Sequence, residues 1–164
     1  MTLVVEDGTG LSTAESYISV ADTDTRHTAL GNTAWTGTTA AKETALRVAT
    51  EYMEQVFRQN WKGHRVDYDQ ALSWPRYGAV VDGFDVLSTI VPTDVANACA
   101  DLALKSLSET LAPDLERGVK REKVGPLEVE YDTASPQAKR YRAINNALAA
   151  YLKGSPVMAG LVRA

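Results

Sequence analysis

The sequence has little of what catalysis, metal binding or membrane insertion requires. Of its 164 residues, one is cysteine and two are histidine, so an intrachain disulfide is excluded and a Cys/His metal site is not expected. Cys99 lies among alanine and leucine residues at helical spacing, which indicates a buried, inert thiol. No apolar run approaches the roughly 20 residues that cross a bilayer, and residues 1–7 lack the features of a signal peptide. We therefore expect no contact with a membrane.

The charge is acidic overall and uneven along the chain. The formal net charge is −4, which argues against a protein whose main task is gripping nucleic acid. Residues 1–100 carry 7 Lys and Arg against 13 Asp and Glu, whereas residues 101–164 carry 10 against 8. At this length we expect a single domain, residues 1–154, followed by a C-terminal docking tail, residues 155–164.

Helical patterns dominate the sequence. They run over residues 20–30, 39–58, 92–112 and 135–154, with apolar side chains recurring at three- and four-residue spacing. Ser19 is a candidate N-cap for the first helix, and Pro92 opens the third. We therefore predict a mainly α fold, a small bundle of about four helices with a β-hairpin arm. Its predicted core includes Trp61, Trp74, Leu102, Tyr141 and Leu148.

Residues 60–89 have no clear period, and thirty such residues are long for a loop in a compact domain. They contain Trp61 and Trp74, so we expect a loop packed over the helices rather than a solvated linker. Because Trp74 precedes a proline, its backbone is expected to be extended, with the side chain in the core. Arg76 is expected to stack on Trp74 or to bind a carbonyl group.

Two short β-type runs surround a Gly-Pro turn within residues 117–132. A lone two-stranded hairpin is marginal in water, so we expect this arm to pack on another subunit, with packing on its own helices as the alternative. The C-terminal tail is more apolar than a free tail and is a second candidate for docking. The candidate interface residues are Val119, Arg121, Lys123, Leu127, Val129 and Tyr131 in the arm and Val157, Met158, Leu161 and Val162 in the tail.

Candidate catalytic groups are few. Ser73, His64 and Asp67 are close in sequence, but no Gly-x-Ser-x-Gly motif frames the serine. Asp82 and Asp85 do not fit the twelve-residue calcium loop, and an Asp-Gly turn explains them. We therefore predict no catalytic residue, no metal site and no cofactor.

Two segments, Trp61–Arg65 and Trp74–Tyr77, combine aromatic residues with cations, as proteins that bind single strands do. Tryptophans in a loop beside helices are more often part of the core. Single-stranded nucleic-acid binding therefore stays open as an alternative function.

Four features in order resemble the head–tail connector (adaptor or head-completion) proteins of long-tailed bacteriophages. Similar sequences are also labelled DnaT-like single-stranded-DNA-binding proteins. The features are the opening Leu3–Gly10 followed by Ala14–Ser19, the turn Gly31–Trp35, the segment Ala71–Arg76 with Asp82-Gly83 downstream, and Val119–Tyr131 after a helix that begins at Val91-Pro92.

The connector resemblance implies a structural virion protein and not an enzyme. It implies a homo-oligomeric ring, typically of twelve subunits, beneath the phage portal protein at the head–tail interface, assembled in the host bacterial cytoplasm. Such a ring extends the channel, lets double-stranded DNA pass without sequence-specific binding, and offers a platform to the next neck or tail-completion protein. The DnaT-like label implies a single-stranded-DNA-binding protein instead.

Overall fold

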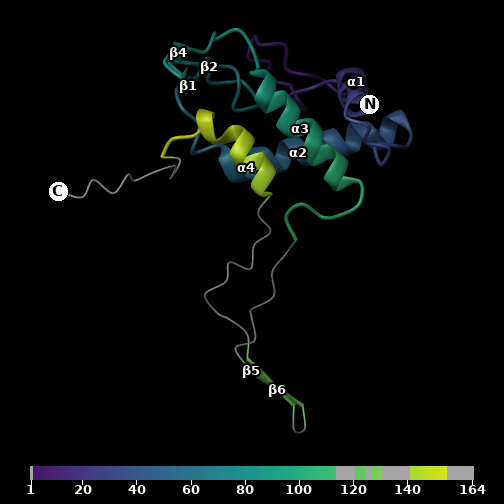
Figure 1. Ribbon diagram of the computed structural model, residues 1–164. Helices are drawn as coiled ribbons and strands as arrows, with labels where there is room; N and C mark the ends of the chain where they lie inside the picture. The colour runs from purple at the N-terminus through teal and green to yellow at the C-terminus, as the bar shows by residue number, and fades with distance from the viewer. Residues whose placement is uncertain (1, 114–120, 125–126, 131–140, 155–164) are drawn as a thin grey trace, which may run out of the picture.

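The computed structural model describes residues 2–113, 121–124, 127–130 and 141–154 (Figure 1). Helices α2 and α3 pack against each other, and α4 packs against α3. In chain order the elements are α1 (Val20–Ala29), α2 (Thr39–Phe57), β1 (His64–Arg65), β2 (Arg76–Tyr77), β3 (Val80–Val81), β4 (Phe84–Asp85), α3 (Thr93–Ser106), β5 (Arg121–Val124), β6 (Leu127–Glu130), α4 (Arg142–Leu148) and the 3-10 helix η1 (Ala149–Tyr151).

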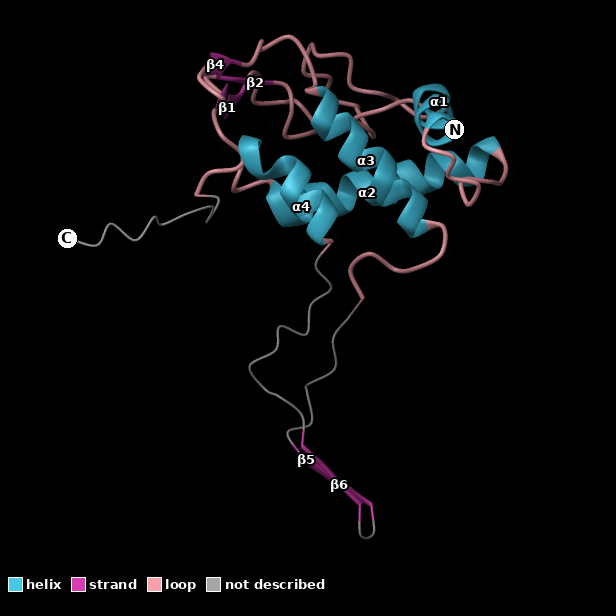
Figure 2. Cartoon of the chain, in the orientation of Figure 1, coloured by secondary structure: helices cyan, strands magenta, loops and turns pink. Residues whose placement is uncertain are grey.

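The predicted mainly α bundle is wrong, because the domain is mixed α and β. Within the described ranges, the helices are accompanied by three two-stranded antiparallel sheets, β1–β2, β3–β4 and β5–β6, and by long loops (Figure 2). The difference lies largely between α2 and α3. There, Pro75 and turns at Gly63, Gly78 and Gly83 prevent a helix, so backbone groups pair across short strands instead.

The helix starts follow from local side-chain chemistry. The Ser19 hydroxyl oxygen accepts a hydrogen bond from the Asp22 N–H at 3.0 Å, and Thr38 caps α2 in the same way. Pro92 is the N-cap of α3, which begins at Thr93, one residue after the predicted start. Helix α4 begins at Arg142, and its predicted opening at residues 135–136 lies outside the described residues.

The core forms where α2, α3 and α4 meet the loop between α2 and α3. The apolar stripe of α2 includes Leu46, Ala49 and Met53, which are all fully buried. Four of the predicted core residues have no exposed surface, whereas Tyr141 is partly buried. Its ring packs edge-on against Tyr52 at 5.5 Å and lies under the Lys105 ammonium group. The four buried residues are Trp61, Trp74, Leu102 and Leu148.

The loop between α2 and α3 is packed around Arg76. The guanidinium group donates to the carbonyl oxygens of Lys62 and Gly63, both at 2.7 Å, and of Ser73 at 3.0 Å. Burial lowers the pKa of Arg76 from its usual value. The expectation that this arginine binds a carbonyl group is therefore confirmed. The Trp61 and Trp74 rings meet edge-on beside it at 5.7 Å.

Strands β5 and β6 form the predicted antiparallel hairpin, in a register that runs from the pair Arg121 and Glu130 to the pair Val124 and Leu127. Neither strand contacts another helix or strand of the described chain (Figure 1). The rest of the predicted arm, within residues 117–132, lies outside the described residues.

Candidate nucleic-acid interface

Three aromatic side chains of the loop between α2 and α3 are exposed to solvent. The exposed fraction is 89% for Tyr68, 78% for Phe84 and 53% for Tyr77. An exposed aromatic ring offers an apolar face on which a flat ligand can stack. The two tryptophans of the same loop are buried, so they are not available for stacking on a ligand.

Strands β1 and β2 position the first of these rings. His64 lies directly opposite Tyr77 in the antiparallel register, and the two ring centroids are 5.4 Å apart. The approach of the strands depends on Gly63, whose φ is +68°. A Cβ atom there would lie 2.4 Å from the Tyr77 carbonyl oxygen. The glycine therefore allows the close contact that holds the tyrosine at the surface.

Strands β3 and β4 position Phe84. Asp82 and Gly83 join them with φ angles of 52° and 86°, which is the left-handed pair that a tight hairpin turn requires. Val81 lies opposite Phe84 in this register. Because the hairpin has only two residues on each side, nothing on it covers the phenylalanine ring.

Lys62, which lies just before β1, links this segment to β3 and to η1. Its ammonium group donates to the Val80 carbonyl oxygen at 3.2 Å and to the Ala150 carbonyl oxygen at 2.8 Å. The neighbouring backbone pairs Trp61 with Leu152 in an isolated antiparallel bridge. Figure 1 shows β1, β2 and β4 at one end of the molecule, beyond the end of α4. The exposed rings at this end are therefore held on a connected scaffold.

Most of the cations in this loop already bind backbone carbonyl oxygens. Arg65 donates to the carbonyl oxygens of Gln70 and Tyr68 at 2.8 and 3.0 Å, and Arg76 and Lys62 are bound as described above. Arg58 and Lys153 are exposed, and the Lys153 N–H donates to the Asn60 carbonyl oxygen at 2.6 Å. In the described part of the chain these two side chains make no ion pair. Both side chains are exposed and could therefore meet a phosphate group.

The loop also carries four aspartates, at positions 67, 69, 82 and 85. They outnumber the three cations within residues 60–90, which are Lys62, Arg65 and Arg76. A ligand at this surface would therefore gain little from long-range attraction and more from contact with the rings.

The structure separates the residues that a hydrolytic triad would need. The Ser73 hydroxyl is fully buried and donates to a Glu54 carboxylate oxygen at 2.7 Å. The His64 ring lies tilted beside the Tyr77 ring, and the Asp67 carboxylate accepts from the Asp69 N–H. Glu54 also accepts from the Tyr17 hydroxyl, whose burial raises its pKa well above the usual value. This serine therefore stabilises the loop, and it does not face a substrate.

No group of three or more His, Cys, Asp or Glu side chains in the described ranges could hold a metal ion. The buried His27 ring instead bonds the Ala100 carbonyl oxygen and the Asn32 amide, both at 3.1 Å. Cys99 is fully buried beside Thr50 and Ser16, and burial raises the pKa of its thiol. These two residues stabilise the core.

The β5–β6 register pairs the candidate interface residues of the arm across the hairpin. Arg121 lies opposite Glu130, Lys123 opposite Glu128, Leu127 opposite Val124 and Val129 opposite Glu122. The remaining candidates, Val119, Tyr131, Val157, Met158, Leu161 and Val162, lie outside the described residues.

Sequence reasoning missed Tyr68 and Phe84 as exposed aromatic residues.

Within the described ranges, no helix has both the length and the apolar character that a bilayer crossing requires. A family model described as "Putative DnaT-like ssDNA binding protein" matches residues 1–164. The comparisons with curated proteins and with solved structures found no match.

Proposed function

Because the chain belongs to the DnaT-like single-stranded-DNA-binding family, we propose that it binds single-stranded nucleic acid at the exposed rings of Tyr68, Tyr77 and Phe84. The observation that carries this proposal is the exposure of three aromatic side chains in one loop, while its tryptophans are buried. Unpaired bases stack on such rings, and each stacked base contributes about 1–3 kcal/mol.

The charge distribution defines how the strand would be held. The local excess of aspartate disfavours a duplex, whose two backbones carry a dense negative charge and whose bases are already stacked. Arg58 and Lys153 would each contact one phosphate group, and the rings would supply most of the affinity. We expect binding that tolerates many sequences, since every base has a face that can stack.

Alanine variants test the role of the rings directly. Replacing Tyr77 and Phe84 with alanine removes two stacking surfaces, so the dissociation constant for a fluorescent single-stranded oligonucleotide should rise by about tenfold or more. Leu30 is exposed on the segment after α1, and Leu30→Ala is the matched control that should leave binding unchanged. Unchanged anisotropy titrations for the double variant would exclude this surface as the binding site.

One observation favours a second candidate, a head–tail connector of a tailed phage. The β5–β6 hairpin contacts no other helix or strand of the described chain, and both outer edges are free to pair with another subunit. In this proposal the chain forms a homo-oligomeric ring, of twelve subunits by resemblance, between the portal protein and the next neck protein. Double-stranded DNA would pass through the ring, and no catalytic step would be involved.

Mass measurements separate the two candidates. A connector subunit should show a mass well above its 17.8 kDa monomer, alone or with purified portal protein. A monomer that does not bind portal protein but binds single-stranded oligonucleotide supports the first candidate.

A further inference from the structure

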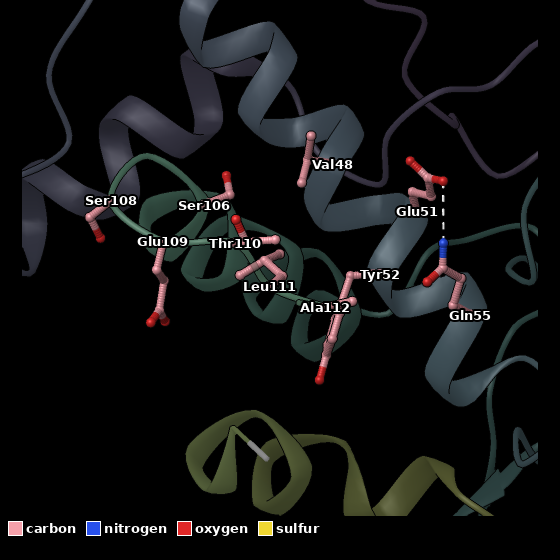
Figure 3. Close-up of a pocket in the computed structure, with 10 residues that line it drawn as sticks. All are labelled: Val48, Glu51, Tyr52, Gln55, Ser106, Ser108, Glu109, Thr110, Leu111 and Ala112. Atoms are coloured by element: carbon pink, nitrogen blue, oxygen red, sulfur yellow. Dashed lines mark hydrogen bonds between the residues drawn. The ribbon is translucent and has the colours of Figure 1, made fainter. Parts of the chain in front are cut away.

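A groove of about 510 Å³ lies between α2 and the segment that follows α3. Figure 3 shows Val48, Glu51, Tyr52 and Gln55 on α2 at one side, with residues 106–112 at the other. Polar and apolar side chains both line the groove, and its two charged residues, Glu51 and Glu109, are acidic. The groove therefore suits an apolar segment that carries a positive charge.

The apolar residues of α2 in this groove are Val48 and Tyr52, and their line continues along the helix to Val56, just outside the groove. Val48, Tyr52 and Val56 repeat every four residues and so lie along one line of the helix. The exposed fractions of the two valines are 40% and 42%, which leaves apolar surface uncovered beside the buried Tyr52. Helix α4 does not cover it, because α4 packs against α3 rather than α2.

Both charged groups that line the groove are carboxylates. Glu51 accepts from the Gln55 amide at 3.2 Å, and Glu109 lies against the Tyr141 hydroxyl, whose pKa is raised to about 12 by burial and then by this carboxylate. Among the described residues, two cations near the groove are engaged: Arg47 pairs with Glu15 at 2.9 Å, and Lys105 lies over the Tyr141 ring.

We propose that the C-terminal segment of the same chain, residues 155–164, docks in this groove. The segment reads Ser-Pro-Val-Met-Ala-Gly-Leu-Val-Arg-Ala, so it combines apolar side chains with one cation. Leu161 and Val162 would cover the valine surface of α2, and Arg163 would lie against Glu51. The charge and polarity of the segment therefore complement the side chains that line this groove.

The length of the chain allows this contact. The start of α4 is fixed beside the groove, because the Tyr141 hydroxyl donates to the Leu111 carbonyl oxygen at 3.5 Å. Residues 142–151 then rise by about 15 Å, and an extended segment of seven to nine residues after Gly154 spans roughly 23–32 Å. A short tether of this kind gives an effective concentration in the millimolar range, so a weak contact suffices.

Disulfide trapping in the full chain tests the proposal. The pair Val48→Cys with Val162→Cys should form an intramolecular disulfide several-fold faster than the control pair Leu30→Cys with Val162→Cys. The native Cys99 is buried and does not compete. Equal rates for the two pairs, or a disulfide-linked dimer in place of a crosslinked monomer, would overturn docking within one chain.

Charge reversal adds a second test, in which damage to the fold could not produce the expected rescue by the combined variant. Glu51→Lys and Arg163→Glu should each slow the trapping several-fold, and the two changes together should restore it. The proposal would also be overturned if trapping stays slow in the combined variant, or if neither single change alters its rate. Neither residue belongs to the proposed nucleic-acid surface, so oligonucleotide binding should not change in any of these variants.

Discussion

At the scale of single residues, the proposed interface depends on how closely the backbone can approach itself. Gly63 and Gly78 both have a left-handed φ, +68° and +66°, but their surroundings differ. A Cβ atom at position 63 would meet backbone atoms at 2.4–3.0 Å, whereas one at position 78 would meet nothing within 4 Å. The two glycines therefore separate the conformational cost of a side chain from its steric cost.

Alanine at each glycine measures the two costs. Gly78→Ala should lower the free energy of unfolding by about 1–2 kcal/mol, the usual cost of a left-handed conformation. Gly63→Ala should cost clearly more, because β1 must also move away from the Tyr77 carbonyl group. Urea unfolding of both variants checks this expectation, and equal losses would show that the close approach is not needed.

Asp24 links the α1 and α2 helices in a way that depends on pH. Its carboxylate accepts from the Lys42 ammonium at 2.8 Å and from the Trp35 indole N–H at 2.6 Å. These contacts, the lysine first, hold the pKa of Asp24 below its usual value. Because the folded state then binds fewer protons, this stabilisation is present above about pH 4 and is lost as the pH falls through the lowered pKa.

Replacing Asp24 with asparagine should therefore matter at neutral pH and much less in acid. The carboxylate is nearly half exposed, so the loss at pH 7 should be only about 0.5–1 kcal/mol. Denaturant unfolding of the native chain and Asp24→Asn at pH 7 and at pH 3 gives the comparison. A difference that is the same at both pH values would contradict the assigned role.

At the scale of elements, predictability depends on the length of the pattern. Helix α2 carries its apolar stripe over 19 residues, and the hydroxyl of Ser19 marks the start of α1, so both helices could be predicted. Strands β1 to β4 have two residues each, which is too short to show an alternating period. The pairing of His64 in β1 with Tyr77 in β2 joins positions that are not neighbours in the sequence, so it depends on the tertiary fold.

The candidate interface was only partly visible in the sequence for the same reason. The aromatic and basic segments were noted, but composition does not tell which rings are buried. The tertiary fold covers Trp61 and Trp74 with helices, while the short β3–β4 hairpin leaves Phe84 uncovered. The Asp-Gly turn at positions 82 and 83 was the one local signal that could have placed this phenylalanine at a hairpin surface.

The β5–β6 hairpin gives a prediction that belongs to an element. Leu127 and Val129 alternate with Glu128 and Glu130 along β6. If Leu127 and Val129 contact another subunit, Leu127→Asp with Val129→Asp should reduce the mass in solution to that of a monomer and leave the far-UV circular dichroism unchanged.

Glu128→Ala with Glu130→Ala is the control at the alternate positions of β6, and it should keep the native mass. A native chain that is monomeric alone and with portal protein would remove the basis of the connector candidate. An assembled chain that the aspartate variant leaves intact would place the contact elsewhere.

At the scale of the whole molecule, the acidic net charge and the exposed rings favour the same kind of binding. A chain with a net charge of −4 has little long-range attraction for a polyanion. Affinity for a nucleic acid must then come from short-range contact with bases, which are accessible in a single strand and hidden in a duplex.

The salt dependence of binding tests this account most directly. With Arg58 and Lys153 as the two phosphate contacts, the logarithm of the binding constant for a single-stranded oligonucleotide should fall against the logarithm of salt concentration with a slope near −1.4. The duplex of the same sequence should bind at least about tenfold more weakly. No binding to the single strand, or equal binding to the duplex with a much steeper slope, would contradict base stacking on Tyr68, Tyr77 and Phe84.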